Sequence, residues 1–218
     1  RKEFCLAEPL EKYDQLVPIN GLAHVYTFLA RVLAQLKLEE LTQDRSGTLR
    51  NGAHELRSRL LEQGCSSISG SCTGGKNWGE IWDRTQIGLG RWGETCASAY
   101  LLRFAAKMTV LENDPVFGDL FERVMYNAFF GAQSEDGLRQ RYFIPFNEPG
   151  EWFRQETYCC PNNLRRMMFE IPEAVYFRTG NGIAVNLYSD SVLNIPGTKI
   201  EQKTFYPESG KIRLKIHS

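Results

Sequence analysis

The sequence predicts a multidomain chain in which an α-helical domain is followed by an antiparallel β domain. Two observations support this prediction: apolar residues recur at helical spacing up to about residue 172, and the repeat then changes from 3.6 residues to 2. A run of helices followed by a run of strands is typical of chains whose helices and strands form separate layers or domains. We therefore assign residues 1–172 to the helical domain and residues 173–218 to the beginning of the β domain.

Five helices are expected in the first domain, each with an apolar stripe at helical spacing. The third and fourth are joined by a short polar turn that ends in Pro115, which is typical of an antiparallel helical hairpin. The connection between the second and third, at residues 64–93, is rich in glycine, serine and cysteine. Loops of more than about 15 residues inside compact domains are usually functional. The expected helices cover residues 20–36, 48–63, 94–111, 117–128 and 163 to about 168.

The β domain is expected to contain antiparallel strands at residues 183–188 and 212–216, where apolar and polar side chains alternate. Residues 180–182 and 208–210 have the composition of turns. The β segment is too short to close a sandwich, so we expect the chain to stop inside this domain. The chain also begins with neither methionine nor a signal peptide, and we expect it to be a fragment.

The composition excludes several classes of function. The 218 residues include 26 basic and 26 acidic side chains, and a net charge of zero argues against a nucleic-acid binder or a binder of anionic membranes. No apolar stretch approaches the ~18 residues that cross a bilayer. The cellular compartment cannot be read from this sequence; the cytoplasm and the periplasm of a bacterium are both compatible with it.

The cysteines carry the clearest chemical signal. Cys159 and Cys160 are adjacent, and neighbouring Cα atoms lie only ~3.8 Å apart, whereas an ordinary disulfide needs about 5.5 Å. Adjacent thiolates can instead bind one soft metal ion, and with Cys96 and Glu94 they make the four ligands of a tetrahedral Zn²⁺ site. The alternative for the last two is structural: Glu94 as a partner of a helix N-terminus and Cys96 as a small core residue. Both can reach one ion only if Glu94 precedes the first regular turn of its helix.

Three further residues are candidates for contact with a substrate. Glu80 lies among tryptophans, where a carboxylic acid with a raised pKa can serve as general acid; the alternative is an exposed loop glutamate. Trp78 can stack on a sugar ring, although tryptophans more often pack in cores. His24, which lies off the main apolar stripe of the first helix, can bind a hydroxyl group or act as a structural histidine. Nucleotide-binding and serine-hydrolase motifs do not occur in the sequence.

Several motifs, in this order along the chain, resemble those of glycoside hydrolase family 127, the β-L-arabinofuranosidase-like proteins. The resemblance extends from about residue 20 to residue 218. Its most specific parts are Glu-Thr-Cys-Ala-Ser at residues 94–98 and Cys-Cys-Pro at residues 159–161. The supporting parts are Thr-Gly-Gly at 73–75, Gly-Glu at 79–80, Met-Tyr-Asn-Ala at 125–128 and the strand at 183–188.

The resemblance implies the later helices of an (α/α)₆ barrel, with the catalytic pocket in its centre, followed by the start of an antiparallel β-sandwich. It implies a retaining glycosidase with a carbohydrate substrate and Zn²⁺ as cofactor, and it allows a homodimer formed through the β-domains of the full-length protein. The zinc ligands would be Glu94, Cys96, Cys159 and Cys160. Cys159 would also be the nucleophile and Glu80 the general acid/base, with His24 facing the sugar.

The sequence departs from the family pattern between Glu80 and Glu94, where an expected Asp-Tyr-Asp-like run is absent. This departure affects the sugar specificity more than the metal or the nucleophile, so L-arabinofuranose is an expectation taken from relatives. Two other classes of function stay open. One is a non-catalytic carbohydrate-binding α-barrel protein with a structural zinc, and the other is a redox protein that joins Cys159 to Cys160. A chain that lacks the early barrel helices is also expected to be inactive, and to aggregate or unfold in part, when it is expressed alone.

Overall fold

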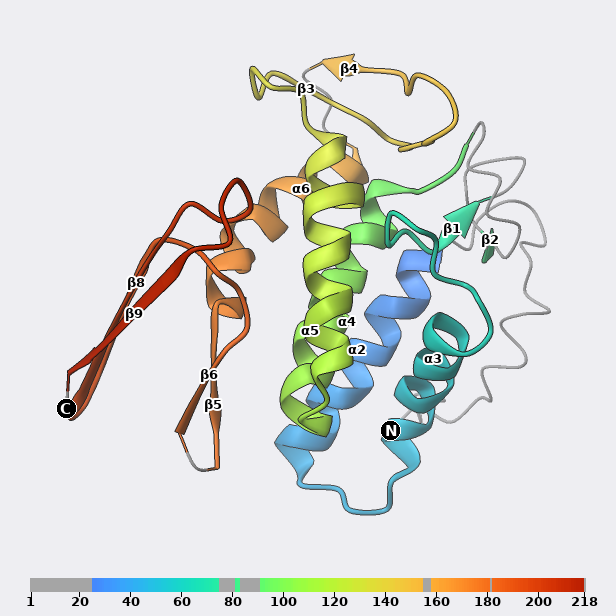
Figure 1. Cartoon of the computed structure of the whole chain (residues 1–218). Helices are drawn as coiled ribbons and strands as arrows, with labels where there is room; N and C mark the ends of the chain where they lie inside the picture. Colours follow the sequence, from blue (N-terminus) through green and yellow to red (C-terminus); the bar gives the residue numbers. More distant parts are fainter. Residues whose placement is uncertain (1–24, 75–80, 83–90, 155–157, 181, 218) are drawn as a thin grey trace.

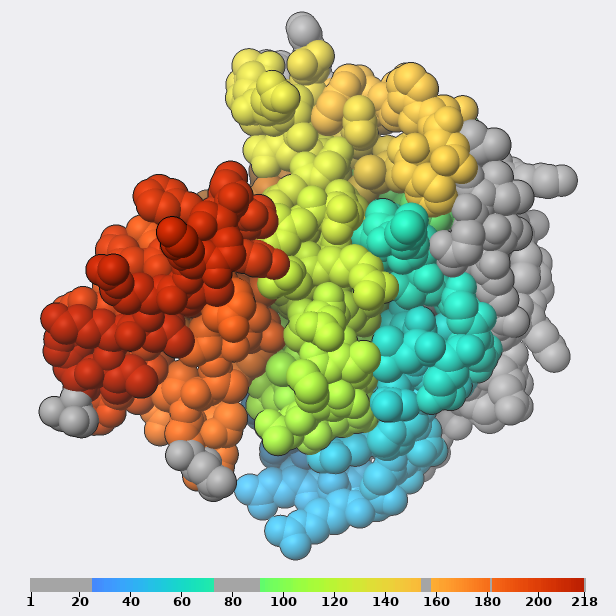
Figure 2. Space-filling model, in the orientation of Figure 1, coloured from blue at the N-terminus to red at the C-terminus, as the bar shows by residue number. Residues whose placement is uncertain are grey.

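The computed structural model describes residues 25–74, 81–82, 91–154, 158–180 and 182–217. Figure 1 shows a bundle of helices with the strands between residues 176 and 217 on one side of it, whereas β3 and β4 lie beyond one end of the bundle and β1 and β2 on the opposite side. Figure 2 shows that the strands between residues 176 and 217 cover the first of these flanks. The helices are α2 (Val25–Thr42), η1 (Thr48–Arg50), α3 (Asn51–Leu61), α4 (Thr95–Glu112), α5 (Pro115–Arg123), the π-helix η2 (Val124–Phe129), η3 (Phe130–Ala132), α6 (Cys159–Glu170) and η4 (Ile171–Ala174). The strands are β1 (Thr73–Gly74), β2 (Ile81–Trp82), β3 (Arg139–Gln140), β4 (Phe153–Arg154), β5 (Tyr176–Thr179), β6 (Gly182–Val185), β7 (Ser191–Ile195), β8 (Thr198–Thr204) and β9 (Ile212–His217).

Helix α4 is the centre of the helical part, because it packs against α2, α5 and α6. Its apolar stripe meets those of its neighbours in one core, in which the rings of Phe104 and Phe117 make an edge-to-face contact with centroids 6.0 Å apart. Leu29 of α2 and Phe121 of α5 are fully buried in the same core. The helical part is therefore held together mainly by burial of apolar surface.

The turn between α4 and α5 confirms the expected pair of packed helices, and local sequence explains it. Asn113 ends α4 with a left-handed φ of 51°, a conformation that asparagine tolerates better than most residues. Asp114 then caps α5, since its side chain accepts a hydrogen bond of 3.0 Å from the backbone nitrogen of Val116. Pro115 occupies the first turn, where its missing N–H has no cost.

Several expected helix boundaries differ from the structure. Helix α2 continues to Thr42, and α3 ends at Leu61, with Gly64 at a φ of 72° just beyond it. Helix α6 begins at Cys159 instead of residue 163, because proline is well tolerated in a first helical turn and Pro161 does not interrupt it. Both adjacent cysteines therefore belong to the first turn of α6.

The β part consists of two antiparallel sheets, β5–β6 and β7–β8–β9. Strand β9 confirms the expected strand at residues 212–216, but its apolar face is not buried, because Leu214 and Ile216 are 43% and 67% exposed. Strand β6 ends at Val185 rather than at residue 188. Asn186 turns the chain there, because its backbone and side-chain nitrogens donate to Val175 and Ala174, each over 2.9 Å. Among the described residues, no helix combines the length and the apolar composition that a membrane crossing requires.

Candidate active site and metal centre

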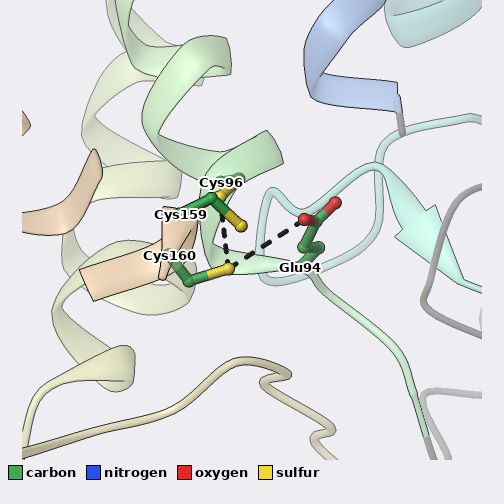
Figure 3. Close-up of side chains that lie close together, drawn as sticks. All are labelled: Glu94, Cys96, Cys159 and Cys160. Atoms are coloured by element: carbon green, nitrogen blue, oxygen red, sulfur yellow. Dashed lines mark hydrogen bonds between the residues drawn. The ribbon is translucent and has the colours of Figure 1, made fainter. Parts of the chain in front are cut away.

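The four residues that the sequence suggests as metal ligands lie together. The ligand atoms of Glu94, Cys96, Cys159 and Cys160 are all within 4.8 Å of one another, although 65 or so positions separate the two halves of the set in the chain. Figure 3 shows the four side chains gathered where two helices begin. The expected convergence of one carboxylate and three sulfurs is thus confirmed.

Each half of the cluster is placed by the start of a helix. Glu94 is the residue before α4 and has extended backbone angles (φ −62°, ψ 129°), which is the condition under which it and Cys96 can face one point. Cys159 and Cys160 are the first two residues of α6, which packs against α4. Two helix N-termini therefore meet at the cluster, and their partial positive charges favour anionic side chains.

A neighbouring segment holds the start of α4 in place. The backbone nitrogen of Thr95 donates to the Tyr142 carbonyl over 2.9 Å, and its hydroxyl donates to the Arg141 carbonyl over 2.7 Å. Glu94 itself forms an antiparallel bridge with Phe143. Gly93 has a φ of 71° and leaves little room for a side chain, since a Cβ there would lie 3.1 Å from the Ile144 carbonyl. The ligand-bearing segment is therefore fixed against residues 141–144 by backbone contacts.

The distances within the cluster suit a shared cation. The sulfurs of Cys96 and Cys160 lie 3.2 Å apart, and the Cys160 sulfur lies 3.9 Å from Glu94 Oε1 (Figure 3). On the other side, the amide nitrogen of Asn163 lies 3.2 Å from the Cys96 sulfur. The hydroxyl of Tyr142 lies 4.0 Å from the Cys159 sulfur. Three sulfurs and a carboxylate oxygen around one point form the donor set of a tetrahedral zinc-type site.

Without a cation this environment disfavours negative charge. Glu94, Cys96 and Cys160 are 0% exposed. Burial raises the pKa of the Cys160 thiol, and the hydrogen bond with Cys159 is the main cause that raises the pKa of Cys96. Burial, followed by the charge of Glu94, also raises the pKa of Tyr142. A bound divalent ion reverses this balance because it stabilises the deprotonated ligands, so the residues present fit such an ion.

A cavity of about 760 Å³ opens beside the cluster. Of the four ligand residues, Cys159 is the one that lines it, and it is also the one that is partly exposed. Aromatic rings form much of the wall, including Tyr142 and Tyr158, which are stacked with centroids 5.6 Å apart. Such walls suit the apolar faces of sugar rings. The cavity is lined by Arg91, Tyr142, Phe143, Pro145, Glu148, Pro149, Gly150, Glu151, Phe153, Tyr158 and Cys159.

The sequence alone did not identify the wall of this cavity. The only available signal was an irregular, aromatic-rich stretch between the fourth and fifth expected helices, which gave no indication of which rings face the thiols. The three candidates His24, Trp78 and Glu80 lie outside the described residues, so their places in the site stay predictions.

None of the described cysteines forms a disulfide. Cys65 and Cys72 are buried and do not belong to the four-residue cluster; burial, followed by the charges of Cys65 and Glu94, raises the pKa of Cys72. Cys159 and Cys160 are likewise not joined to each other. The vicinal disulfide of the redox alternative is thus not present in this structure.

Comparison with known proteins gives consistent matches. Residues 24–173 match the family model described as β-L-arabinofuranosidase, GH127 catalytic domain. A non-reducing end β-L-arabinofuranosidase of Bifidobacterium longum subsp. longum is 24% identical over 145 residues, which is 57% of this chain and 22% of that protein. The crystal structure of Ara127N-Se, a GH127 β-L-arabinofuranosidase from Geobacillus stearothermophilus T6, superimposes with a TM-score of 0.74 at 27% identity. It is matched by 88% of this chain, which covers 33% of its length.

A second solved structure, a glycoside hydrolase, has a TM-score of 0.61 at 19% identity, and the match covers 88% of this chain and 37% of that one. That likeness concerns the fold alone. The chain therefore spans about a fifth of the curated relative and about a third of the solved structures that it matches.

Proposed function

The chain belongs to glycoside hydrolase family 127, and from this premise we propose that the full-length protein is a retaining glycosidase that uses Cys159 as a metal-bound nucleophile and Glu80 as general acid/base. The proposed substrate class is β-L-arabinofuranosides, from which L-arabinofuranose is released. In this proposal residues 1–172 are the C-terminal part of an (α/α)₆ catalytic barrel and residues 173–218 begin a β-sandwich.

One observation carries the proposal: Cys159 belongs to the ligand cluster and at the same time lines the 760 Å³ cavity. Cys96 and Cys160 are fully buried and cannot touch a substrate. A nucleophile must be activated and also reach the reacting carbon, and among the three clustered thiols Cys159 meets both conditions. The volume lies in the range of about 300–1,000 Å³ that is usual for small-molecule sites.

The proposed reaction has two steps. The Cys159 sulfur attacks the anomeric carbon, a C–S bond forms, and the C–O bond to the leaving group breaks while Glu80 protonates the departing oxygen. Glu80 then takes a proton from water, whose oxygen attacks the same carbon and displaces the sulfur. Two inversions give net retention, as in retaining glycosidases that use a carboxylate nucleophile.

When bound, a zinc ion at this centre supplies a positive charge that keeps its thiol ligands deprotonated near neutral pH. The other tasks fall to the residues of the chain. The N-termini of α4 and α6 favour the anionic ligands, and the stacked rings of Tyr142 and Tyr158 line the same cavity as Cys159. The Tyr142 hydroxyl, 4.0 Å from that sulfur, is oriented toward it.

The alternative is a non-catalytic carbohydrate-binding α-barrel protein with a structural zinc. The observation in its favour is the burial of the centre, because structural zinc sites are closed and use four protein ligands. In this alternative Cys159 is a fourth structural ligand, and the cavity binds a sugar without cleaving it.

The test uses the full-length protein, its zinc content and a panel of aryl furanosides and pyranosides. Glu80→Gln should lower turnover by about 10²- to 10⁴-fold, the usual contribution of a general acid/base, and leave the zinc content unchanged. The matched control is Glu62→Gln, which removes an exposed carboxylate beyond α3 and should leave turnover unchanged. A zinc-containing parent protein that cleaves no member of the panel would favour the binding protein.

A further inference from the structure

One buried amide touches the centre without belonging to the ligand set. Asn163 is 6% exposed, and its Nδ2 atom lies 3.2 Å from the sulfur of Cys96. It follows Cys159 by four residues and Cys160 by three, so all three side chains lie on one face of α6. The helix face that supplies two thiols therefore also supplies a polar group directed at the third, which belongs to α4.

The chemistry of this contact depends on the state of Cys96. A metal-bound thiolate has no hydrogen and can only accept hydrogen bonds, whereas the nitrogen of a primary amide carries two donors. The amide nitrogen faces the sulfur, which is the arrangement that a thiolate requires. A hydrogen bond to a charged acceptor is also stronger than one between neutral groups.

The charge of the ligand set shows why such a donor is needed. One carboxylate and three thiolates carry four formal negative charges, and a divalent cation balances two of them, so the occupied centre keeps a formal charge of −2. Three of the four ligand residues are fully buried, and uncompensated charge is costly there. A neutral N–H donor stabilises a thiolate without competing with it for the ion. Such a donor also fixes the orientation of the Cys96 side chain relative to the ion.

We propose that Asn163 is a positioning residue of the metal centre, which donates a hydrogen bond to the Cys96 sulfur and thereby orients this ligand and strengthens metal binding. The inference rests on the proposed function in one respect, since it assumes that the centre binds a divalent metal. It adds a fifth residue to the centre, and this residue acts through a ligand without touching the ion or the substrate.

The test measures metal binding by the full chain and requires no substrate. Asn163→Asp replaces the donor by a negatively charged acceptor, and Asn163→Leu removes the donor but keeps the number and branching of the side-chain heavy atoms. Asn162→Asp is the matched control, because it makes the same change at the adjacent, exposed position. Zinc affinity is measured by competition with a chromophoric chelator, and the sulfur-to-metal charge-transfer bands are recorded after cobalt(II) substitution.

Both Asn163 variants should bind zinc about 10- to 100-fold more weakly than the parent, the usual cost of losing an outer partner of a ligand, with the larger loss for Asn163→Asp. Their cobalt bands should shift, whereas Asn162→Asp should match the parent in affinity and spectrum. Shifted bands identify a changed thiolate environment, which a purely structural role of Asn163 would not produce.

Parent-like affinity and bands in both variants would overturn the inference and leave the proposed function intact. Should Asn163→Asp fail to fold, as judged by its circular dichroism without metal, the Asn163→Leu variant decides the outcome. A parent protein that binds neither zinc nor cobalt would overturn the metal centre itself, and with it this inference.

Discussion

Helix α4 has a buried start and a buried middle, and burial has opposite energetic consequences in these two regions. In the middle of the helix, Leu101, Phe104 and Met108 are at most 2% exposed and lie in the apolar core. At its start Glu94 and Cys96 are 0% exposed and face other thiols. Burial of apolar side chains stabilises a fold by about 25 cal/mol per Å², whereas burial of anionic groups costs free energy unless a cation compensates it. The degree of burial therefore does not distinguish the start of α4 from its middle; the chemistry of the buried atoms does.

The largest effect on stability is expected in the apolar middle of α4. Phe104→Ala should lower the free energy of unfolding by about 3–5 kcal/mol, because it removes a ring that packs against Phe117 and leaves a cavity. Chemical denaturation of the full-length protein measures the loss, and Phe169→Ala, at a position 84% exposed, should change it by no more than about 0.5 kcal/mol. The loss should be the same with and without a metal chelator. A loss of unfolding free energy that depends on the chelator would show that the middle and the start of α4 are not independent.

A smaller, metal-dependent effect on stability is expected at the start of α4. Free zinc at about 100 times its dissociation constant should stabilise the parent by about 2.7 kcal/mol, and a chelator should abolish this gain. Glu94→Gln should remove most of the response to the chelator, since it replaces the anionic carboxylate of the proposed ligand set by a neutral amide. Without metal this variant should be at least as stable as the parent, because no carboxylate is then buried beside the thiols. A chelator response of parental size in Glu94→Gln would exclude Glu94 as a ligand.

The ion pair between α4 and α6 should contribute less to stability than either the middle or the start of α4. Arg103 Nη2 lies 2.9 Å from Glu170 Oε1, Arg103 Nε contacts the second carboxylate oxygen, and the guanidinium lies over the ring of Tyr100. Glu170→Gln should cost about 1 kcal/mol, because the pair is well oriented but partly exposed. Glu173→Gln, an exposed neighbour, provides the matched control in the same denaturation measurement. A loss as large as that of Phe104→Ala would show that this pair, rather than the apolar core, holds α6 to α4.

The smallest effect is expected where α2 meets α4 at the surface. Hydrogen bonds from Lys107 and then Lys37 lower the pKa of Glu40 from 4.5 to about 2. A carboxyl group with a lowered pKa stabilises the folded state above its unfolded pKa and loses that contribution as the pH falls through its folded pKa. The small difference in melting temperature between the parent and Glu40→Gln should therefore be present at pH 7 and shrink between pH 4.5 and 2. A difference that is constant over this interval would contradict the role of Glu40.

The sequence predicted the helical elements and the clustering of Glu94 with three cysteines better than the helix boundaries and the surroundings of the cluster. The apolar repeat identifies α4 and α5 because core packing requires it, and asparagine and aspartate at 113 and 114 announce the turn between them. The sequence predicted a start of the fifth helix at residue 163, four residues after the observed start of α6 at Cys159. That difference matters because it places Cys159 and Cys160 inside the first turn of α6 rather than before it.

The surroundings of the cluster were not predictable in the same way. Cysteines and a glutamate are recognisable by residue type, and their chemistry limits what they can do. The positions of Tyr142 and Asn163 relative to the sulfurs depend on tertiary packing between separate segments of the chain. Asn163 and Cys96, for example, are 67 residues apart in the sequence. Neither tyrosine nor asparagine carries a pattern in the sequence that announces such a contact.

The backbone contacts between residues 92–95 and 141–144 give the centre a mechanical property. The Trp92 carbonyl accepts from Ile144 over 2.9 Å, Glu94 bridges Phe143, and Thr95 donates to Tyr142, so the wall of the cavity and Glu94 share one short backbone ladder. A displacement of Phe143 would therefore displace Glu94 as well. If the proposed metal centre forms, binding in the cavity and metal coordination would be coupled through this ladder.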